Sequence, residues 1–347
     1  MNGFPATRKS LLKYAQVARV HIGTGQDELS KVENLMHDET EHCGEGHRHI
    51  HIDSQELILG TSENMRCIPD KSIDLIITSP PYWNLKRYGG HPQQIGPQPY
   101  EEYLRRLNIV WQECYKKAKD NAVLVINVNS RRVRKRFYPI PFDIVREMKG
   151  WTLWDVMIWY VPNALPQPRH YMERLFDNKT EFLLIFTKNH ETNYTFHKPR
   201  VPQKYVYADP RPHKKNEKGR CLGNIIRIPA YRPPNVKALN YHEAAFPEEL
   251  VALFIETYTD PGYTVLDPFL GSGTTLKVAR VMGRRGIGFE INEKYEDLIR
   301  AKILEPWEVP DWRTIDILHS STMQTGIEKP RKIHFLRQAN GLFTRGG

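Results

Sequence analysis

The chain has 347 residues and carries 50 Lys and Arg residues against 40 Asp and Glu residues, a formal net charge of +10. That length allows a full hydrophobic core in one large or two modest domains, and the basic excess suits a polyanionic partner as well as ordinary solubility. The four cysteines lack paired spacing, which argues against a disulfide framework and favours a reducing, cytoplasmic location. No apolar run is long enough for a membrane helix, which argues against a membrane span.

Residues 1–53 are predicted to form a polar N-terminal extension with a helical patch. There Arg8, Lys9 and Lys13 alternate with leucines and valines, a pattern typical of a basic surface helix and also compatible with a transit peptide. The segment from His42 to His51 is rich in histidine, but zinc sites need separated pairs of ligands and this cluster has no partner. We therefore expect a solvated histidine-rich linker there, and no metal site.

From residue 54 the chain alternates between short apolar runs and amphipathic segments. Residues 122–128 form a continuous apolar run, which is typical of a central parallel strand buried on both faces. Strands that alternate with helices indicate an α/β fold with a doubly wound, mostly parallel sheet. The expected strands are 57–59, 73–78, 122–128, 153–160, 181–187, 264–266 and 286–291, and the expected helices are 62–67, 100–118, 142–148, 247–258 and a segment after 274.

Two regions lack a regular period. Residues 188–240 are crowded with Pro, Lys, Arg and Tyr, and residues 307–347 form a basic, weakly patterned tail. The chain is therefore expected to divide into an N-terminal extension (1–53), two halves of one α/β domain (54–187 and 241–306), the irregular region between the halves (188–240) and the tail (307–347).

A polar turn closes the expected strand 73–78. It contains Ser79, Pro80, Pro81 and Tyr82, and its prolines end the sheet ladder because they lack an N–H. Open α/β sheets bind their ligands at the carboxyl ends of the strands. A rigid carbonyl, a hydroxyl and an aromatic ring at such a position suit the binding of a planar base by its exocyclic amine, although a Pro-Pro turn alone often only ends a strand.

A glycine-rich loop follows the expected strand 264–266. Gly271 and Gly273 let the backbone approach a ligand closely, and the helix that begins after them offers free N–H groups to a carboxylate. Glu290, seventeen residues after Gly273, ends a strand where an acid suits ribose hydroxyls. The loop has no Gly-Lys-Ser/Thr run and lacks a third glycine, so it differs from phosphate-binding and dinucleotide-binding motifs.

Together these motifs resemble those of the β class of S-adenosylmethionine-dependent DNA amino-methyltransferases. The run Ser79-Pro80-Pro81-Tyr82 resembles the catalytic tetrapeptide of that family, it precedes the cofactor motif as in the β class, and the resemblance covers residues 55–302. It implies a Rossmann-like methyltransferase fold with a target-recognition region at 188–240, and S-adenosylmethionine as the cofactor. The residues it implies for cofactor binding are His242, Phe246, Asp267, Pro268, Phe269, Gly271, Ser272, Gly273, Thr274, Thr275, Glu290 and Asn292.

Two positions qualify the resemblance. Phe246 suits a place in the hydrophobic core equally well. Many members of the family carry a Gly-Asp pair whose carboxylate contacts the adenine of the cofactor, whereas this chain has Gly60-Thr61-Ser62 at the corresponding position. This departure puts the usual carboxylate contact to the adenine in doubt.

The resemblance implies methyl transfer to an exocyclic amine in double-stranded DNA. Family members with Ser at the first position of the tetrapeptide usually methylate cytosine N4, and members with Asp or Asn usually methylate adenine N6. Ser79 therefore favours cytosine N4 and leaves adenine N6 open. The amine would donate to Ser79 Oγ and to the Pro80 carbonyl, while Tyr82 stacks on a base swung out of the duplex. The alternative from another class is a non-catalytic, cofactor-sensing DNA-binding protein, and the two intact motifs argue against it.

Basic residues interleaved with aromatic residues are candidates for DNA contacts, although such clusters also occur in solvated surface loops. One cluster follows the expected strand 122–128, and a second lies within 197–220. The expected contact residues are Arg131, Arg132, Arg134, Lys204, Tyr205, Arg211, Lys214 and Lys215. The expected partners are double-stranded DNA at the nucleoid and, in a restriction–modification system, a cognate restriction endonuclease. The sequence is compatible with a monomer and with a homodimer.

Overall fold

The computed structural model describes residues 40–43, 46–84, 91–167, 170, 172–188, 193–201, 220–230 and 247–305. The expected helical patch near the N-terminus and the expected C-terminal tail lie outside these residues. Among the helices of the described ranges, none is both long and apolar enough to cross a membrane.

The main sheet has ten strands in the order β1-β2-β3-β14-β13-β4-β5-β9-β8-β12. Its central strands are all parallel: β3 (Gln55–Leu59), β14 (Arg285–Glu290), β13 (Thr264–Asp267), β4 (Ile73–Thr78) and β5 (Ala118–Val128). Beyond β5, the strand β9 (Thr180–Thr187) is antiparallel to both β5 and β8 (Thr152–Tyr160), and β12 (Ile225–Arg227) runs parallel to β8. The predicted α/β class with a doubly wound, mostly parallel sheet is confirmed.

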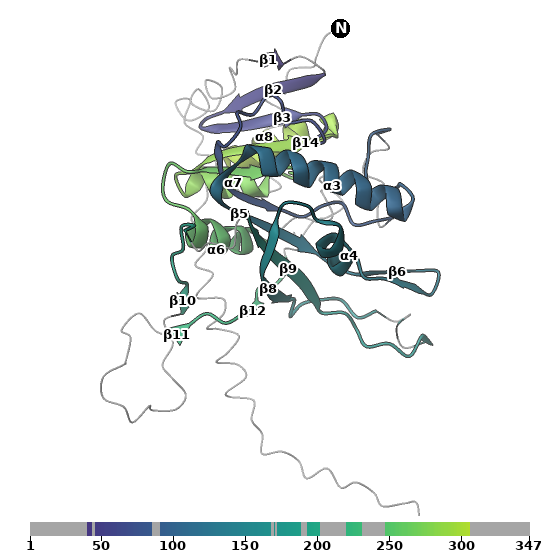
Figure 1. Ribbon diagram of the computed structural model, residues 1–347. Coiled ribbons are helices and arrows are strands. Elements are labelled where there is room, and N and C mark those ends of the chain that lie inside the picture. Colours follow the sequence, from purple (N-terminus) through teal and green to yellow (C-terminus); the bar gives the residue numbers. More distant parts are fainter. Residues whose placement is uncertain are drawn as a thin grey trace, which may run out of the picture.

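Helices cover both faces of this sheet (Figure 1). On one face lie α3 (Tyr100–Lys117) and α4 (Ile140–Glu147). On the other lie α6 (Glu248–Tyr258), α7 (Thr274–Val281) and α8 (Glu296–Leu304), the last preceded by the short 3₁₀ helix η1 (Glu293–Tyr295). Two small hairpins, β6 (Arg131–Val133) with β7 (Arg136–Tyr138) and β10 (Arg200–Val201) with β11 (Arg220–Cys221), stand outside the main sheet.

Strand β4 explains why the chain folds in layers. All its residues are buried, and successive side chains of a strand point to opposite faces. Ile76 packs in the core under α3, together with Leu107, whereas Leu75 and Ile77 pack in the core under α6. Burial of each such side chain contributes about 1.5–3 kcal/mol, so both layers hold β4 in the middle of the sheet.

The histidine-rich segment is part of the sheet, and its prediction as a solvated linker was wrong. β1 (Thr40–Cys43) pairs antiparallel with β2 (His47–Ile52), which pairs antiparallel with β3. Ile50 and Ile52 are fully buried and pack in the same core as Ile299 and Ile303 of α8. The apolar residues at alternate positions give β2 a face that the sheet can bury.

The predicted helix at 62–67 was also wrong, because these residues form turns. The hydroxyl of Thr61 accepts the N–H of Glu63 at 3.3 Å, and Asn64 Oδ1 accepts the N–H of Arg66 at 3.2 Å. Such short-range bonds from side chain to backbone compete with helix formation. The region 188–240 was expected to lack regular structure, yet it contributes β12 to the main sheet.

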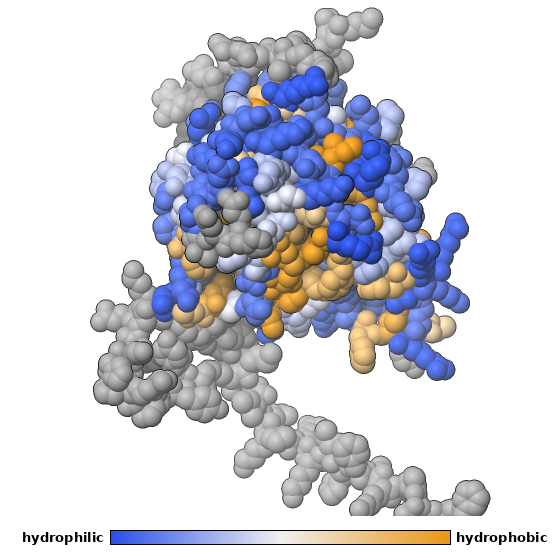
Figure 2. Space-filling view, viewed as in Figure 1, coloured by the Kyte–Doolittle hydropathy of each residue, from blue (hydrophilic) through white to orange (hydrophobic). Residues whose placement is uncertain are grey.

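The face of the molecule seen in Figure 2 is mostly hydrophilic, and hydrophobic surface reaches it mainly over the region of α4, β8 and β9. Exposed apolar side chains in that region include Phe142 of α4 and Leu153 and Trp154 of β8. Contiguous apolar surface on a protein often marks a place where something binds.

Candidate active site

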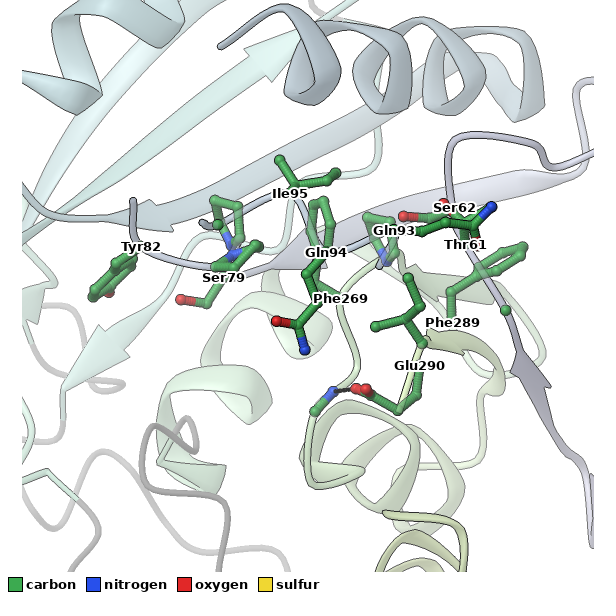
Figure 3. Close-up of a pocket in the computed structure, with 17 residues that line it drawn as sticks. Thr61, Ser62, Ser79, Tyr82, Gln93, Gln94, Ile95, Phe269, Phe289 and Glu290 are labelled. Carbon is green, nitrogen blue, oxygen red and sulfur yellow. Dashed lines mark hydrogen bonds between the residues drawn. The ribbon is translucent and has the colours of Figure 1, made fainter. Parts of the chain in front are cut away.

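One pocket at the carboxyl edge of the sheet is lined by both sequence motifs (Figure 3). Ser79 and Tyr82 come from the turn after β4, and Gly271 comes from the loop after β13, so residues from opposite ends of the chain share one cleft. The pocket residues are Gly60, Thr61, Ser62, Ser79, Pro80, Pro81, Tyr82, Gln93, Gln94, Ile95, Gly96, Pro268, Phe269, Gly271, Phe289, Glu290 and Ile291.

The strand order explains why the cleft forms there. β4 is followed by α3 and by β5 on one side, whereas β13 is followed by α7 and by β14 on the other side. The chain therefore leaves the adjacent strands β4 and β13 in opposite directions, and such a switch point opens a crevice at the strand ends. The Thr78 hydroxyl donates to Asp267 Oδ1 at 2.7 Å and joins the two strands at the base of the crevice.

Asp267 is buried behind the pocket and takes no part in its lining. Besides the bond from Thr78, its carboxylate accepts the hydroxyl of Thr275 at 2.6 Å and the N–H of Phe269 at 3.0 Å. Burial raises the pKa of Asp267 to about 6, and these hydrogen bonds act in the opposite direction. Asp267 thus holds the start of the glycine-rich loop to β4 and to the beginning of α7.

Glu290 ends β14 and organises the glycine-rich loop from the other side. Its Oε2 accepts the N–H of Gly271 at 2.9 Å, shown in Figure 3, and its Oε1 accepts the N–H of Asn292 at 2.8 Å. Burial raises the pKa of Glu290 to about 7, in part opposed by these backbone bonds. Each carboxylate oxygen keeps capacity for a further hydrogen bond, so Glu290 can still accept hydroxyl groups of a ligand.

Gly271 and Gly273 have φ angles of +58° and +90°, which L side chains rarely adopt. At Gly273 a Cβ would also come within 3.1 Å of Ile299 in α8. These glycines therefore let the loop turn tightly into α7.

A buried lysine supports the loop from α8. Lys302 Nζ donates to Thr274 Oγ1 at 2.7 Å and to Ser272 Oγ at 3.2 Å, and burial lowers its pKa to about 8. Some of the predicted cofactor residues line the pocket, namely Pro268, Phe269, Gly271 and Glu290. Others are buried and do not line it, namely Ser272, Gly273, Thr274, Thr275 and Asn292. The predicted His242 and Phe246 lie outside the described residues.

Tyr82 forms the end of the pocket nearest β5 and β9. Its hydroxyl donates to Glu181 Oε2 at 2.6 Å and lies 3.5 Å from Asn127 Oδ1. Burial raises the pKa of Glu181, while the bonds from Tyr82 and Asn127 lower it. In contrast, the Ser79 hydroxyl makes no hydrogen bond to another described residue, and it remains available to a ligand in the pocket.

Gln94 is a pocket residue that the sequence did not reveal. It is only 5% exposed, and neither Nε2 nor Oε1 of its amide has a hydrogen-bond partner among the described residues. In Figure 3 it is seen between Ser79 on one side and Thr61 and Ser62 on the other. A buried amide without partners is costly, so a ligand with polar groups is the natural partner for it.

Two further residues hold the pocket together from outside. Arg106 of α3 pairs with Glu63, and its guanidinium also donates to the backbone carbonyls of Gln93 and Gln94 at 2.8 and 3.2 Å. His47 of β2 packs over Gly60 and bonds to the Thr61 carbonyl at 3.1 Å. Both were missed because only the folded chain brings them to the pocket.

The predicted DNA-contact residues are only partly described. Arg131 and Arg132 lie in β6 and Arg134 in the turn between β6 and β7, and Arg131 and Arg132 line a second cavity that also includes Tyr82. Lys204, Tyr205, Arg211, Lys214 and Lys215 lie outside the described residues. Within the described ranges, no group of three or more His, Cys, Asp or Glu side chains is arranged to hold a metal ion.

The pocket fits an amino-acid-bearing nucleoside such as S-adenosylmethionine. It offers about 780 Å³ of space, including the part open to solvent. Phe269, Phe289 and Ile95 form apolar walls that could pack against a purine, and the Glu290 carboxylate has acceptors that could bind ribose hydroxyls. The unpartnered amide of Gln94 adds a polar group that a ligand would satisfy.

Comparison with known proteins agrees with this geometry. Residues 73–301 match the family model of DNA methylases that act on adenine N6 or cytosine N4. The type II methyltransferase M.BglII of Bacillus subtilis is 30% identical over 79% of this chain and 76% of its own length. M.SmaI of Serratia marcescens, also a type II methyltransferase, is 27% identical over 78% of this chain and 96% of its own.

Solved structures show the same fold. The PvuII DNA methyltransferase, which is cytosine-N4-specific, superposes with a TM-score of 0.54 at 23% identity, over 78% of this chain and 93% of its own. A protein of Thermus thermophilus assigned as a DNA modification methylase superposes with a TM-score of 0.50 at 25% identity, over 72% of this chain and 95% of its own. The chain therefore belongs to the S-adenosylmethionine-dependent DNA amino-methyltransferases, the family that methylates exocyclic amines of adenine or cytosine.

Proposed function

We propose that this enzyme methylates the N4 amine of cytosine at a specific sequence in double-stranded DNA, with the target base flipped out of the helix. The observation that carries the proposal is the free Ser79 hydroxyl in the same pocket as Gly271 and Glu290. A hydroxyl at the first position of the tetrapeptide favours cytosine over adenine, as the resemblance of Ser79-Pro80-Pro81-Tyr82 implies.

Ser79 and Pro80 prepare the amine. An exocyclic amine shares its lone pair with the ring and is a poor nucleophile. When both of its N–H groups donate, one to Ser79 Oγ and one to the Pro80 carbonyl, the nitrogen moves toward tetrahedral geometry and its lone pair points along one direction. S-adenosylmethionine supplies the methyl group from its sulfonium centre. Positioning of the amine by these two acceptors then accounts for much of the rate.

Tyr82 provides the surface on which the flipped base stacks. Its hydroxyl is held by Glu181 at 2.6 Å, so the ring orientation is fixed before DNA arrives. Stacking on an aromatic ring contributes about 1–3 kcal/mol per base. Pro81 lies close to Gly96, where an added Cβ would come within 3.5 Å of the Pro81 side chain.

The cofactor residues have separate roles in this proposal. Glu290 accepts the ribose hydroxyls, and the loop from Pro268 to Gly271 surrounds the methionine end. Asp267, Ser272, Gly273, Thr274, Thr275 and Asn292 act behind the pocket by shaping that loop and the β14 end. Gln94 contributes polar contacts to the bound cofactor. In many family members a carboxylate after β3 makes a polar contact to the cofactor, and this chain has no carboxylate at that position, Gly60-Thr61-Ser62.

Recognition of the DNA sequence is assigned to basic residues outside the pocket. We propose that the region 188–240 reads the sequence, with Lys204, Tyr205, Arg211, Lys214 and Lys215 among its contacts, and that Arg131, Arg132 and Arg134 bind phosphates. As in other restriction–modification systems, the partner would be a restriction endonuclease that cuts the same unmethylated sequence. The enzyme would work where genomic DNA lies, in the cytoplasm at the nucleoid.

The test is the chemical identity of the product. DNA from cells that express the protein is sequenced with a modification-sensitive method and digested to nucleosides for mass analysis. Cytosine methylated at N4, absent with Ser79→Ala, supports the proposal, and N6-methyladenine would reassign the target base. No new methyl group on DNA, with cofactor binding intact, would favour a non-catalytic DNA-binding protein.

A further inference from the structure

A second cavity lies on the far side of Tyr82 from the cofactor pocket, and Tyr82 lines both. This outer groove is defined by the residues Tyr82, Asn129, Ser130, Arg131, Arg132, Phe137, Phe142, Gln167, His170, Leu175, Phe176, Asn178, Thr180 and Phe182. It offers about 1510 Å³ of space, including the part open to solvent. Because Tyr82 lines both cavities, a ligand in this groove lies next to the pocket that contains Ser79.

One wall of the groove is the β6–β7 hairpin, which is strongly basic. Arg131, Arg132, Arg134, Lys135 and Arg136 follow one another within six residues, and the hairpin has no acidic residue. The Arg132 guanidinium stacks 5.4 Å from the centre of the Phe137 ring, and Phe137 is 52% exposed. This wall presents positive charge next to an aromatic ring, a combination that suits phosphates and bases.

The opposite wall is the loop between β8 and β9, whose tip is apolar and exposed. Phe176 is 98% exposed, and Leu165 and Met172 of the same loop are 65% and 81% exposed. In Figure 2 this corner of the molecule shows hydrophobic surface beside strongly hydrophilic surface. A fully exposed Phe at the mouth of a groove is unfavourable in water and indicates a surface that becomes covered.

Hydrogen bonds hold the described part of this loop in shape. Gln167 donates two hydrogen bonds across the loop: its backbone N–H donates to Asp177 Oδ1 at 3.2 Å, and its side-chain amide donates to the Asn178 carbonyl at 3.2 Å. The His170 ring bonds to the Phe176 carbonyl at 3.1 Å. These bonds fix the backbone on both sides of the Phe176 side chain and leave the ring itself directed into solvent.

We propose that the outer groove binds the DNA duplex around the target base, and that Phe176 inserts into the base stack at the position the flipped base leaves. The inference rests on the proposed DNA methylation and adds the residue that keeps the duplex open. Proteins that distort DNA commonly insert an apolar side chain between base steps, because the ring replaces the lost stacking. The continuity of the groove with Tyr82 places the gap in the duplex next to the pocket that receives the base.

Charge favours DNA over a second copy of the chain as the occupant. In a symmetric dimer formed through this groove, the same surface would face itself, so the five basic residues of one hairpin would lie near those of the other. Like charges at that distance repel, whereas a phosphate backbone neutralises them and releases counterions.

The test compares Phe176→Ala with Met172→Ala, which changes another exposed apolar residue of the same loop that does not line the groove. The probe is a duplex with the methylated sequence found by sequencing, and a second duplex carries a mismatch opposite the target base. Flipping from a mismatch costs less. We expect Phe176→Ala to lower the methylation rate on the matched duplex about tenfold or more, since unstacking costs a few kcal/mol. On the mismatched duplex the rate should return to within about threefold of wild type, and Met172→Ala should behave as wild type on both.

Two readouts separate this inference from the proposed function. Cofactor affinity, measured by calorimetry with S-adenosylhomocysteine, should be unchanged in Phe176→Ala, and fluorescence of 2-aminopurine at the target position should fall. Equal loss on both duplexes, or no loss, overturns the role of Phe176 even when the wild-type enzyme methylates DNA. If the wild type methylates neither duplex, the proposed DNA methylation is wrong, and the inference about Phe176 is wrong with it. A concentration-dependent dimer that Phe176→Ala abolishes, with DNA affinity unchanged, would make the groove a subunit interface and overturn the inference.

Discussion

The hydroxyl of Thr78 donates to the carboxylate of Asp267 at 2.7 Å across 189 residues of sequence. Thr78 is the last residue of β4 and Asp267 the last residue of β13, so the bond joins the strand that leads into the Ser79–Tyr82 turn to the strand that leads into the glycine-rich loop. Both residues are almost completely buried. The bond fixes the width of the crevice into which both motifs project.

Replacement of Thr78 by Val should therefore cost both stability and cofactor affinity. Removing one partner leaves a buried carboxylate with one hydrogen bond fewer, which costs about 1–3 kcal/mol in the free energy of unfolding. Urea unfolding and calorimetry with S-adenosylhomocysteine measure the two effects. Thr257→Val is the control, since the Thr257 hydroxyl bonds only within its own helix, to the Leu253 carbonyl at 2.7 Å. Equal effects of the two changes on cofactor affinity would contradict the role of the Thr78 bond.

Cofactor affinity should fall as the pH drops through about 7, the pKa to which burial raises Glu290. Below that pH the carboxyl group is protonated and accepts hydroxyl groups less well. Glu290→Gln should bind the cofactor more weakly at pH 8 and show a flatter profile between pH 6 and 8. A profile as steep as that of the wild type would assign the titration to another group.

The same shift predicts how the stability of the apo protein varies with pH. The folded state of Glu290 holds its proton up to about pH 7, whereas the unfolded state loses it near 4.5. Between those values the folded state binds more protons, so stability falls as the pH rises through this window. Asp267, with a pKa of about 6, contributes in the same direction. Thermal unfolding of Glu290→Gln should show a smaller decline from pH 4.5 to 7 than the wild type.

Gln94→Leu should have opposite effects on the apo protein and on the complex. The buried amide has no partner among the described residues, so an apolar side chain of similar size should leave the apo protein equally or more stable. The dissociation constant for S-adenosylhomocysteine should rise about tenfold, as expected for two lost hydrogen bonds of about 0.5–1.5 kcal/mol each. Gln93→Leu, an exposed neighbour that also lines the pocket, is the matched control. Lower apo stability of Gln94→Leu with unchanged affinity would show that the amide serves the fold.

Tyr82 and Glu181 should act as a unit in turnover. Tyr82→Phe removes the hydroxyl that Glu181 accepts and leaves a half-buried carboxylate without that bond, so we expect turnover to fall about tenfold while cofactor affinity stays unchanged. Glu181→Gln keeps an acceptor for the hydroxyl and should be milder. The double variant should be no slower than Tyr82→Phe, whereas additive losses would mean that the two residues act independently.

Sequence recognition should move with the segment 202–219. A replacement limited to these residues, taken from a relative with another target, spares β12 and its pairing with β8. The expected outcome is a new methylated sequence in genomic DNA at unchanged cofactor affinity. An unchanged target sequence would place recognition elsewhere, with the outer groove as the first region to examine.

The strand β4 and its turn could be read from the sequence because their information is local. An apolar run, two prolines and an aromatic ring define where the strand ends, and the glycines near Gly271 do the same for the cofactor loop. Helix α3 was equally clear, since its buried residues recur with a helical period.

The residues that sequence analysis missed act through partners far away in the chain. Gln94 has no local signature, and its buried amide becomes evident only when α3, through Arg106, holds its loop against the pocket. Glu181 was recognised as the start of a strand, but its bond to Tyr82 depends on the antiparallel register of β9 with β5. His47 was assigned to a linker because a histidine-rich run is polar in composition, whereas its burial comes from pairing with β3.

The position of β13 has a consequence for how the newly made protein becomes active. β13 lies between β14 and β4, and without it no strand joins β4 to β14 and β3 on the cofactor side of the sheet. On the ribosome, the catalytic turn therefore emerges long before the strand that completes the crevice beside it. The growing polypeptide can modify no DNA until nearly the last of its sheet has been translated, and a prematurely terminated product would carry an intact tetrapeptide with no methyl donor to serve it.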